Sequence, residues 1–254
     1  MHPLCGTVLL GVLALGSSPA GAADNPFGSN MPYAACIAAV DKKPDDAFEQ
    51  ALIWRDHGGG LPAEHCAALA LIGLRQPGEA GARLDAMAVR PDAGSPAERA
   101  ALLDQAGNAW MLADQADNAE ASLSAALKVT PRDPDLWIDR ARARALKMDW
   151  TGAEADLTSA LTFDKTKPET FVLRSSALSA LGRNDEARAN IDAALRIDPT
   201  FPEALVERGV MKLANGDKAG ARADWIKVLS RAPDSPAADS ARLHIEEIDV
   251  NPDK

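Results

Sequence analysis

The sequence predicts an all-α protein built from stacked helix pairs, and three observations support this fold class. The 254-residue chain is rich in alanine and only 4% aromatic, which suits helices that approach closely through small side chains and does not suit a deep central core. Charged residues make up 25% of the chain, which is too many for a polytopic membrane protein. A spacing of 34 residues also recurs from residue 100 to residue 235. We therefore expect a thin, layered array of helices.

The first 22 residues are predicted to be a signal peptide. An uncharged apolar run from Leu4 to Leu15 is followed by small residues, and cleavage is expected after Ala22 or Ala23. The alternative is an uncleaved anchor, but the run is well short of the ~20 apolar residues that a spanning helix needs. We therefore expect a periplasmic or secreted protein with no membrane-inserted segment after cleavage.

Two cysteines, Cys36 and Cys66, remain after this cleavage. In an oxidising compartment such a pair normally forms a disulfide, and two buried free thiols are the alternative. A bond between them would stabilise the fold by roughly 3–4 kcal/mol in the chain-entropy model.

The cysteines lie in residues 23–99, where the helical pattern is irregular. Residues 32–56 fit one degenerate helical hairpin and residues 61–94 fit a second. The three glycines at 58–60 read as a helix end and a flexible link between them, and residues 95–99 as a short joint before the regular array. A disulfide would therefore join the two least regular hairpins.

Four units of 34 residues follow: 100–133, 134–167, 168–201 and 202–235. Each unit reads as helix, short turn and helix, and three of them close with a proline that ends the second helix. Small residues occupy the eighth and twentieth places of every unit, where two helices would cross. Those at the twentieth place are Ala119, Ala153, Ala187 and Ala221, and those at the eighth are Gly107, Ala141, Ser175 and Gly209.

This pattern resembles the tetratricopeptide repeat, a pair of antiparallel helices that cross at small residues. The resemblance covers residues 100–235 without a gap, and it implies an α-solenoid, a superhelix of antiparallel helix pairs. The chain departs from the family pattern at Lys165, where a closing proline is usual, and at Arg144 and Lys212, where an aromatic residue is usual. One further amphipathic helix, 236–249, looks like the solvating end cap that such arrays require.

Three units carry arginine at the seventh place and an aspartate or asparagine sixteen residues later. The first unit lacks both residues, so the two positions vary together within this one sequence. Such joint variation favours a hydrogen bond or ion pair between helices over a basic ligand-binding ladder. The pairs are Arg140 with Asp156, Arg174 with Asn190, and Arg208 with Asp224.

Several function classes are disfavoured by the sequence. The net charge of −10 argues against nucleic acid as a partner, because phosphate binding needs basic patches. His57 and His65 lie near Cys66, yet no metal-binding or nucleophile motif includes them, and they are interpreted as a helix-end and a loop-flanking histidine. His244 lies on the final helix without a partner signal. We therefore expect no enzyme, no metal and no cofactor.

The resemblance implies a binding groove lined by the first helix of each unit. Carried over place by place, the candidate residues combine an acidic rim with an apolar stripe, although a row of charges on a helix is also the ordinary solvated face. The Lys, Asn and Arg clamp with which some relatives hold a terminal carboxylate is missing. The candidates are Asp104, Gln105, Asn108, Asp135, Ile138, Asp139, Arg142, Glu169, Val172, Leu173, Ser176, Glu203, Val206, Glu207 and Val210.

The sequence thus predicts an exported scaffold that binds a protein or peptide, with a basic or amphipathic segment as the expected partner. The alternative is a component of a cell-envelope assembly machinery, for cytochrome maturation or division-linked wall synthesis, where relatives of this family also serve. The oligomeric state and the identity of the partner do not follow from the sequence.

Overall fold

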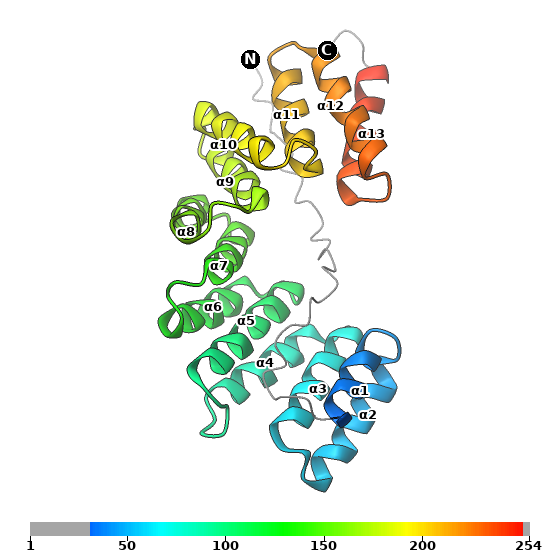
Figure 1. Cartoon of the computed structure of the whole chain (residues 1–254), viewed down its shortest axis with the longest axis vertical. Coiled ribbons are helices and arrows are strands. Elements are labelled where there is room, and N and C mark those ends of the chain that lie inside the picture. Colours follow the sequence, from blue (N-terminus) through cyan, green and yellow to red (C-terminus); the bar gives the residue numbers. More distant parts are fainter. Residues whose placement is uncertain (1–30, 251–254) are drawn as a thin grey trace. The chain divides into compact units, whose positions relative to one another are not determined.

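A computed structural model of the chain describes residues 31–250, and Figure 1 shows that these residues form a succession of helices without a strand. The signal peptide predicted at 1–22 and the last four residues lie outside the described residues. The helices are α1 (Met31–Val40), α2 (Pro44–Trp54), a π-helical turn η1 (Arg55–Gly59), α3 (Gly60–Gly73), α4 (Pro77–Ala88), α5 (Pro96–Leu112), α6 (Ala116–Val129), α7 (Pro134–Leu146), α8 (Trp150–Phe163), α9 (Pro168–Ala180), α10 (Asn184–Ile197), α11 (Pro202–Ala214), α12 (Lys218–Arg231) and α13 (Pro236–Val250).

The described residues fall into two compact units, and the boundary between them lies inside α9. The N-terminal unit contains residues 31–166 and 176–183, and the C-terminal unit contains residues 167–175 and 184–250. The chain is therefore an all-α solenoid of helix pairs, as the sequence predicted. No helix among residues 31–250 is long and apolar enough to span a membrane.

The N-terminal unit is a stack of antiparallel helix pairs, α1 with α2, α3 with α4, α5 with α6, and α7 with α8, each packed on the next. Its interior is formed mostly by alanine and leucine, and Leu84, Leu102 and Leu123 are completely buried. Burial between neighbouring pairs replaces a single large core, which explains how so few aromatic residues suffice.

The regular array begins earlier than the sequence predicted. Residues 95–99 are not a joint, because Ser95 caps α5 and Pro96 starts its first turn. The backbone N–H of Glu98 donates to Ser95 Oγ at 3.3 Å, and the backbone N–H of Ser95 donates to the Glu98 carboxylate at 2.5 Å. This reciprocal arrangement is a capping box.

The glycines at 58–60 lie at a kink between α2 and α3, which agrees with the predicted helix end. Gly58 has φ +88°, in the left-handed region that glycine adopts without strain, and α3 begins at Gly60 immediately afterwards. His65 is also misplaced by the sequence interpretation, since it lies inside α3 and is only 1% exposed.

Four turns inside the pairs of the regular repeats contain a residue in the left-handed region. Gly182 and Gly216 follow α9 and α11 with φ of +75° and +83°, which ends each helix in the left-handed region. Asp114 and Met148 take the same role after α5 and α7 with φ of +57° and +60°. A left-handed residue at each turn reverses the chain so that the second helix runs back along the first.

Helices within a pair approach closely at the small residues. A Cβ atom added to Gly107 would lie 2.5 Å from Leu123 Cγ, and one added to Gly209 would lie 2.3 Å from Trp225 Nε1. Ala187 is fully buried, and its carbonyl accepts a hydrogen bond from Ser175 Oγ at 3.0 Å. The alanine and glycine content of the chain therefore follows from the contact distance between helices.

The C-terminal unit ends in α13, which covers the last pair. Ala238 and Ala241 of α13 are fully buried against a core that contains Trp225 of α12. His244 of α13 stacks on the Trp225 ring with centroids 4.9 Å apart, a partner that the sequence did not predict. Burial of this imidazole lowers the pKa of His244 below its usual value.

Candidate binding surface on the first helices of the pairs

The candidate residues of the N-terminal unit come together between α5 and α7. The Asn108 amide on α5 donates to Asp104 Oδ1 of its own helix and to Asp139 Oδ2 of α7, both at 3.4 Å. Arg142 on α7 contacts Asp139 through Nη1 at 2.5 Å. Two aspartates from different helices therefore share one amide, and Arg142 also contacts the second of them.

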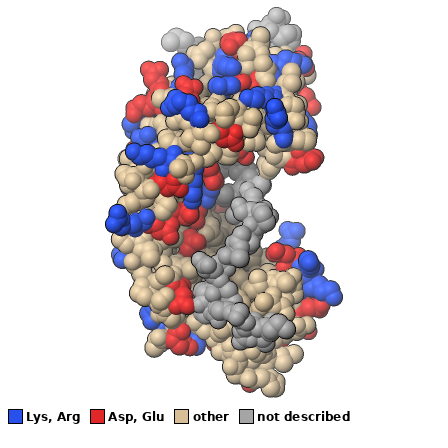
Figure 2. Space-filling model, in the orientation of Figure 1, with Lys and Arg blue, Asp and Glu red and all other residues tan. Residues whose placement is uncertain are grey.

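This arrangement disfavours a full negative charge on both aspartates. Burial and the Asp139 carboxylate raise the pKa of Asp104 to about 8, and Asp133 and Asp135 add to the effect. An acid near another carboxylate in a partly desolvated site keeps its proton to higher pH. Figure 2 shows acidic side chains gathered over the region of α7 on this face.

The candidate residues of the C-terminal unit show the same tendency. Burial raises the pKa of Glu207 on α11 above its usual value. Partial desolvation and then the Glu169 carboxylate do the same for Glu203. In each unit, acidic side chains on the first helices thus lie where burial, and for Asp104 and Glu203 also a neighbouring carboxylate, disfavours the charged form.

The apolar stripe is smaller than the sequence predicted. Ile138 is 3% exposed, and Val172 and Val206 are each 8% exposed, so these three residues offer little surface for contact. Leu173 is partly exposed and Val210 is exposed. These three side chains are buried because residues at the edge of the exposed helix face point toward the neighbouring helix.

Gln105 belongs to an interaction that the sequence did not reveal. Its Oε1 lies 2.5 Å from Nε2 of buried His65, and Nδ1 of the same ring lies 2.7 Å from the Tyr33 hydroxyl. Burial lowers the pKa of His65, so the ring is neutral, donates to Gln105 and accepts from Tyr33. This chain of contacts connects α1, α3 and α5, and Gln105 is therefore engaged in the fold.

The two cysteines are brought together as the sequence predicted. Cys36 on α1 and Cys66 on α3 have Cα atoms 6.2 Å apart, within the range that a disulfide requires, and the two sulfur atoms are in contact. Both residues are buried, Cys66 completely.

The repeated arginines hold helices together and do not form a ligand ladder. Arg140 makes two hydrogen bonds to Asp156, at 2.9 and 2.7 Å, and Arg208 makes two to Asp224, at 2.8 and 2.7 Å. Arg174 Nη1 donates to Asn190 Oδ1 at 3.4 Å. These pairs join the first and second helices of a repeat.

Arg144 and Lys212, which depart from the family pattern, contact the same buried aspartates. Arg144 contacts Asp156 at 3.0 Å, and Lys212 contacts Asp224 at 2.8 Å, so each buried aspartate has two cations. The third 34-residue repeat, residues 168–201, has the neutral Asn190 in place of the aspartate. It has Leu178 in place of the second cation. The second cation is therefore present where the buried group is charged and absent where it is neutral.

In the first 34-residue repeat, residues 100–133, the places that correspond to Arg144 and Asp156 hold two hydrogen-bond donors, and their acceptor lies outside the repeat. Trp110 Nε1 and Ser122 Oγ, at the places of Arg144 and Asp156, donate to the two oxygens of Asp85 on α4 at 2.7 and 2.8 Å. A carboxylate from the preceding hairpin thus replaces the internal one.

The two histidines near Cys66 are engaged by neighbouring groups. His57 Nδ1 lies 2.7 Å from the carbonyl oxygen of Ile53 at the end of α2, whereas His65 is enclosed by Tyr33 and Gln105. No three histidine, cysteine, aspartate or glutamate side chains of the described residues are grouped so that they could hold a metal ion.

Pairs of antiparallel helices that repeat every 34 residues and cross at small side chains define the class of helical-repeat proteins. A family model for the tetratricopeptide repeat matches residues 172–236. This part of the chain therefore consists of tetratricopeptide repeats, and proteins of that family typically act as scaffolds without enzymatic activity. A search of curated proteins found no match to this sequence.

Solved structures of the same fold agree. MamA 41-end from Desulfovibrio magneticus RS-1 is 17% identical with a TM-score of 0.56, over 73% of this chain and 97% of that one. A crystal structure of MamA is 15% identical with a TM-score of 0.55, over 64% and 92% of the two chains. YrrB, described as a tetratricopeptide repeat protein with an unusual peptide-binding site, is 21% identical with a TM-score of 0.52, over 79% and 98%. These likenesses show the shared fold.

Proposed function

We propose that the protein is an exported scaffold that binds a basic or amphipathic segment of a partner protein through the acidic side chains of its first helices. The observation that carries this proposal is the placement of acidic side chains on the first helices: the Asn108 amide joins Asp104 of α5 and Asp139 of α7, and Glu203 and Glu207 lie together on α11. Burial raises the pKa of Asp104, Glu203 and Glu207, which agrees with this placement. A lysine or arginine placed beside such a group would stabilise its charged form and gain binding free energy from it.

The family supports the mode of binding. Tetratricopeptide repeat proteins bind peptides and proteins, and YrrB carries a peptide-binding site on the same fold. Leu173 and Val210 supply exposed apolar contact beside the acidic groups. An amphipathic segment with cationic and apolar side chains matches both features.

The cysteine geometry supports export. A disulfide between Cys36 and Cys66 forms and persists in an oxidising compartment, and the apolar run at Leu4 to Leu15 supplies the targeting signal. A role in envelope assembly remains the alternative within this class, and it uses the same acidic surfaces. Catalysis is not part of the proposal.

The decisive experiment measures binding of a labelled 12-residue peptide made of lysine and leucine by fluorescence anisotropy at two salt concentrations. We expect saturable binding that weakens as salt rises, and no binding of the matched glutamate–leucine peptide, because the surface is acidic. Binding that ignores salt, or a preference for the acidic peptide, would overturn the proposal.

Paired variants localise the site. Glu203→Gln with Glu207→Gln should weaken binding of the lysine–leucine peptide at least about tenfold, which is ~1.4 kcal/mol. The control is Asp185→Asn with Asp192→Asn, which removes two charges from the exposed side of α10 in the same unit. Equal losses in both double variants would show a general charge effect and refute the assignment to the first helices.

A further inference from the structure

A second feature lies in the N-terminal unit, where residues of α2, α3 and α4 come together. A cavity of about 270 Å³ opens there, slightly below the usual range of ~300–1,000 Å³ for sites of drug-sized ligands. Four apolar side chains, one glutamate and three arginines line this cavity. The apolar residues are Leu52, Ala67, Ala86 and Met87.

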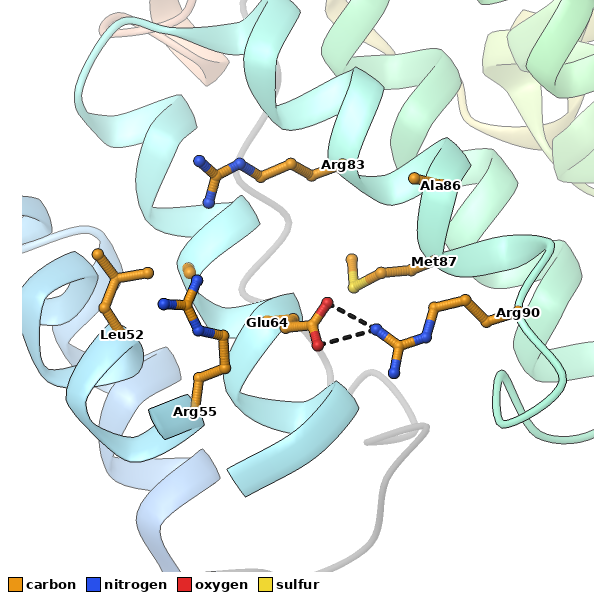
Figure 3. A pocket seen from close by; sticks show the side chains of 8 residues that line it. Leu52, Arg55, Glu64, Arg83, Ala86, Met87 and Arg90 are labelled. Carbon is orange, nitrogen blue, oxygen red and sulfur yellow. Dashed lines mark hydrogen bonds and ion pairs between the residues drawn. The ribbon is translucent and has the colours of Figure 1, made fainter. Parts of the chain in front are cut away.

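The charged residues of this pocket have distinct roles. Arg90 Nη1 contacts both carboxylate oxygens of Glu64, at 2.8 and 2.7 Å, and these two residues face each other on one side of the pocket (Figure 3). Arg55 and Arg83 also line the pocket, and in Figure 3 their guanidinium groups lie on the side of the view away from Arg90. The lining therefore has an excess of two positive charges in a chain whose net charge is −10.

Arg83 has free capacity to bind an anion. Its Nε donates to Glu79 at 2.9 Å, and its two terminal nitrogens make no hydrogen bond to the described residues. The guanidinium group also lies 5.6 Å from the centre of the Phe48 ring, which holds the side chain over α2. Arg55 engages the neighbouring Asp56 through Nε and Nη2 and keeps Nη1 available.

The acidic partners of these two arginines do not block a ligand. The side chains of Asp56 and Glu79 are 63% and 53% exposed, and ion pairs at such positions contribute little stability and exchange readily with solvent. Glu64 is 33% exposed and already engaged by Arg90. An incoming anion can thus take over donors of Arg55 and Arg83 at little cost.

We propose that this pocket binds a monocarboxylate that carries a short apolar group, with the carboxylate held by Arg55 and Arg83 and the apolar group placed against Leu52 and Met87. The planar guanidinium fork matches a carboxylate, as Arg90 illustrates when its Nε and Nη2 donate to the two oxygens of Asp92 at 2.8 and 2.7 Å. A single negative charge fits better than two, since Glu64 lines the pocket and repels a second one. The limited volume admits one small apolar group.

Met87 gives a local readout, because it lines the pocket and its methyl group can be labelled with ¹³C for NMR. We expect N-acetyl-leucine to shift the Met87 methyl resonance in a saturable way. N-acetyl-leucinamide, which has the same apolar group without the charge, should leave the resonance unchanged. An equal response to the acid and the amide, or no response to either, would overturn the proposal.

Variants of the arginines test the assigned roles. Arg83→Gln and Arg55→Gln should each weaken binding of N-acetyl-leucine at least about tenfold, and Arg83→Lys should restore little, because lysine keeps the charge but loses the fork. Arg132→Gln is the matched control, since Arg132 is exposed in the same unit and outside the pocket. Binding that persists in both glutamine variants would refute the site.

The carboxylate could belong to the end of a polypeptide or to a small free acid, and a further titration distinguishes the two. A peptide that ends in leucine with a free carboxylate and binds at lower concentration than N-acetyl-leucine identifies the ligand as the end of a polypeptide. Equal or weaker binding of the peptide identifies it as a small free acid. Both results uphold the carboxylate site, which is independent of the acidic surface on the first helices.

Discussion

The irregular hairpins α1–α4 and the regular repeats solve the same packing problem in different ways. In the repeats, glycine and alanine bring the helices together, and buried aspartates such as Asp156 and Asp224 join them through two cations each. The hairpins lack this repeated pattern and instead use the Cys36–Cys66 contact and the buried ring of His65. The regular repeats are therefore stabilised by the same contacts at recurring positions. The irregular hairpins depend on individual contacts that occur once.

The largest expected effect concerns the hairpins. Replacing both Cys36 and Cys66 with serine should lower the free energy of unfolding by roughly 3–4 kcal/mol, because the bond closes a loop across 30 residues of sequence separation. Hydrogen exchange should show the loss in α1–α3, with α11 and α12 unaffected. Alkylation of two free thiols in protein taken from an oxidising compartment would contradict the disulfide.

The next effect concerns the crossings in the repeats. Ala187→Trp should destabilise the C-terminal unit by about 3 kcal/mol, since Ala187 is fully buried and a large side chain must separate the two helices of its pair. Thermal denaturation followed by circular dichroism measures the change. The control is Ala189→Trp on the same helix, where the side chain is exposed. An unchanged midpoint for Ala187→Trp would show that the repeat register is wrong.

A smaller effect tests the buried aspartates. Hydrogen bonds from Arg208 and Lys212 outweigh the effect of burial and hold the pKa of Asp224 below its usual value. Its charge therefore stabilises the fold above the unfolded pKa near 3.8, and this contribution is lost as pH falls through the lower folded pKa. Asp224→Asn should cost about 2 kcal/mol at neutral pH in chemical denaturation.

The third repeat indicates a second substitution that should restore part of the stability lost in Asp224→Asn. Adding Lys212→Leu to Asp224→Asn reproduces the combination found at Leu178 and Asn190. The double variant should be more stable than Asp224→Asn alone, because the unpaired ammonium group is removed. Simple additivity of the two substitutions would mean that the two places do not act together.

The smallest effect concerns Asp104. Because the pKa of this carboxyl is raised to about 8 in the folded chain, the folded state binds more protons than the unfolded state between about pH 4 and pH 8. Stability from this group therefore falls as pH rises through that window. Asp104→Asn should raise the thermal midpoint by a few degrees relative to the unmodified protein, with a gain that grows from pH 5 to pH 8 and then levels off. A gain independent of pH would contradict the assignment.

The sequence predicted the repeats well because their physical constraint is local and recurs. Small residues at Gly107 and Ala187 mark helix crossings, and the joint variation of Arg140 with Asp156 revealed the ion pair between helices. It failed where the constraint depends on contacts distant in sequence. The partners of His65 lie 32 and 40 residues away, and no periodic signal connects them.

The candidate binding surface was predicted in part. Family positions identified the acidic residues, because charge at a place in the repeat is visible in the sequence. They did not show that Ile138 and Val206 turn inward, since that depends on the packing of neighbouring helices. The arginine pocket was missed altogether, because Arg55 and Arg83 lie on separate hairpins and resemble ordinary solvated charges.

The stacking of Trp225 on His244 gives the C-terminal unit an optical label of its own. The other four tryptophans, Trp54, Trp110, Trp137 and Trp150, all belong to the N-terminal unit, and Trp225 has no exposed surface. Replacing those four with phenylalanine would leave an indole whose emission reports on the last repeat and its cap alone. A red shift of that emission during denaturation would then time the opening of one unit separately from the other.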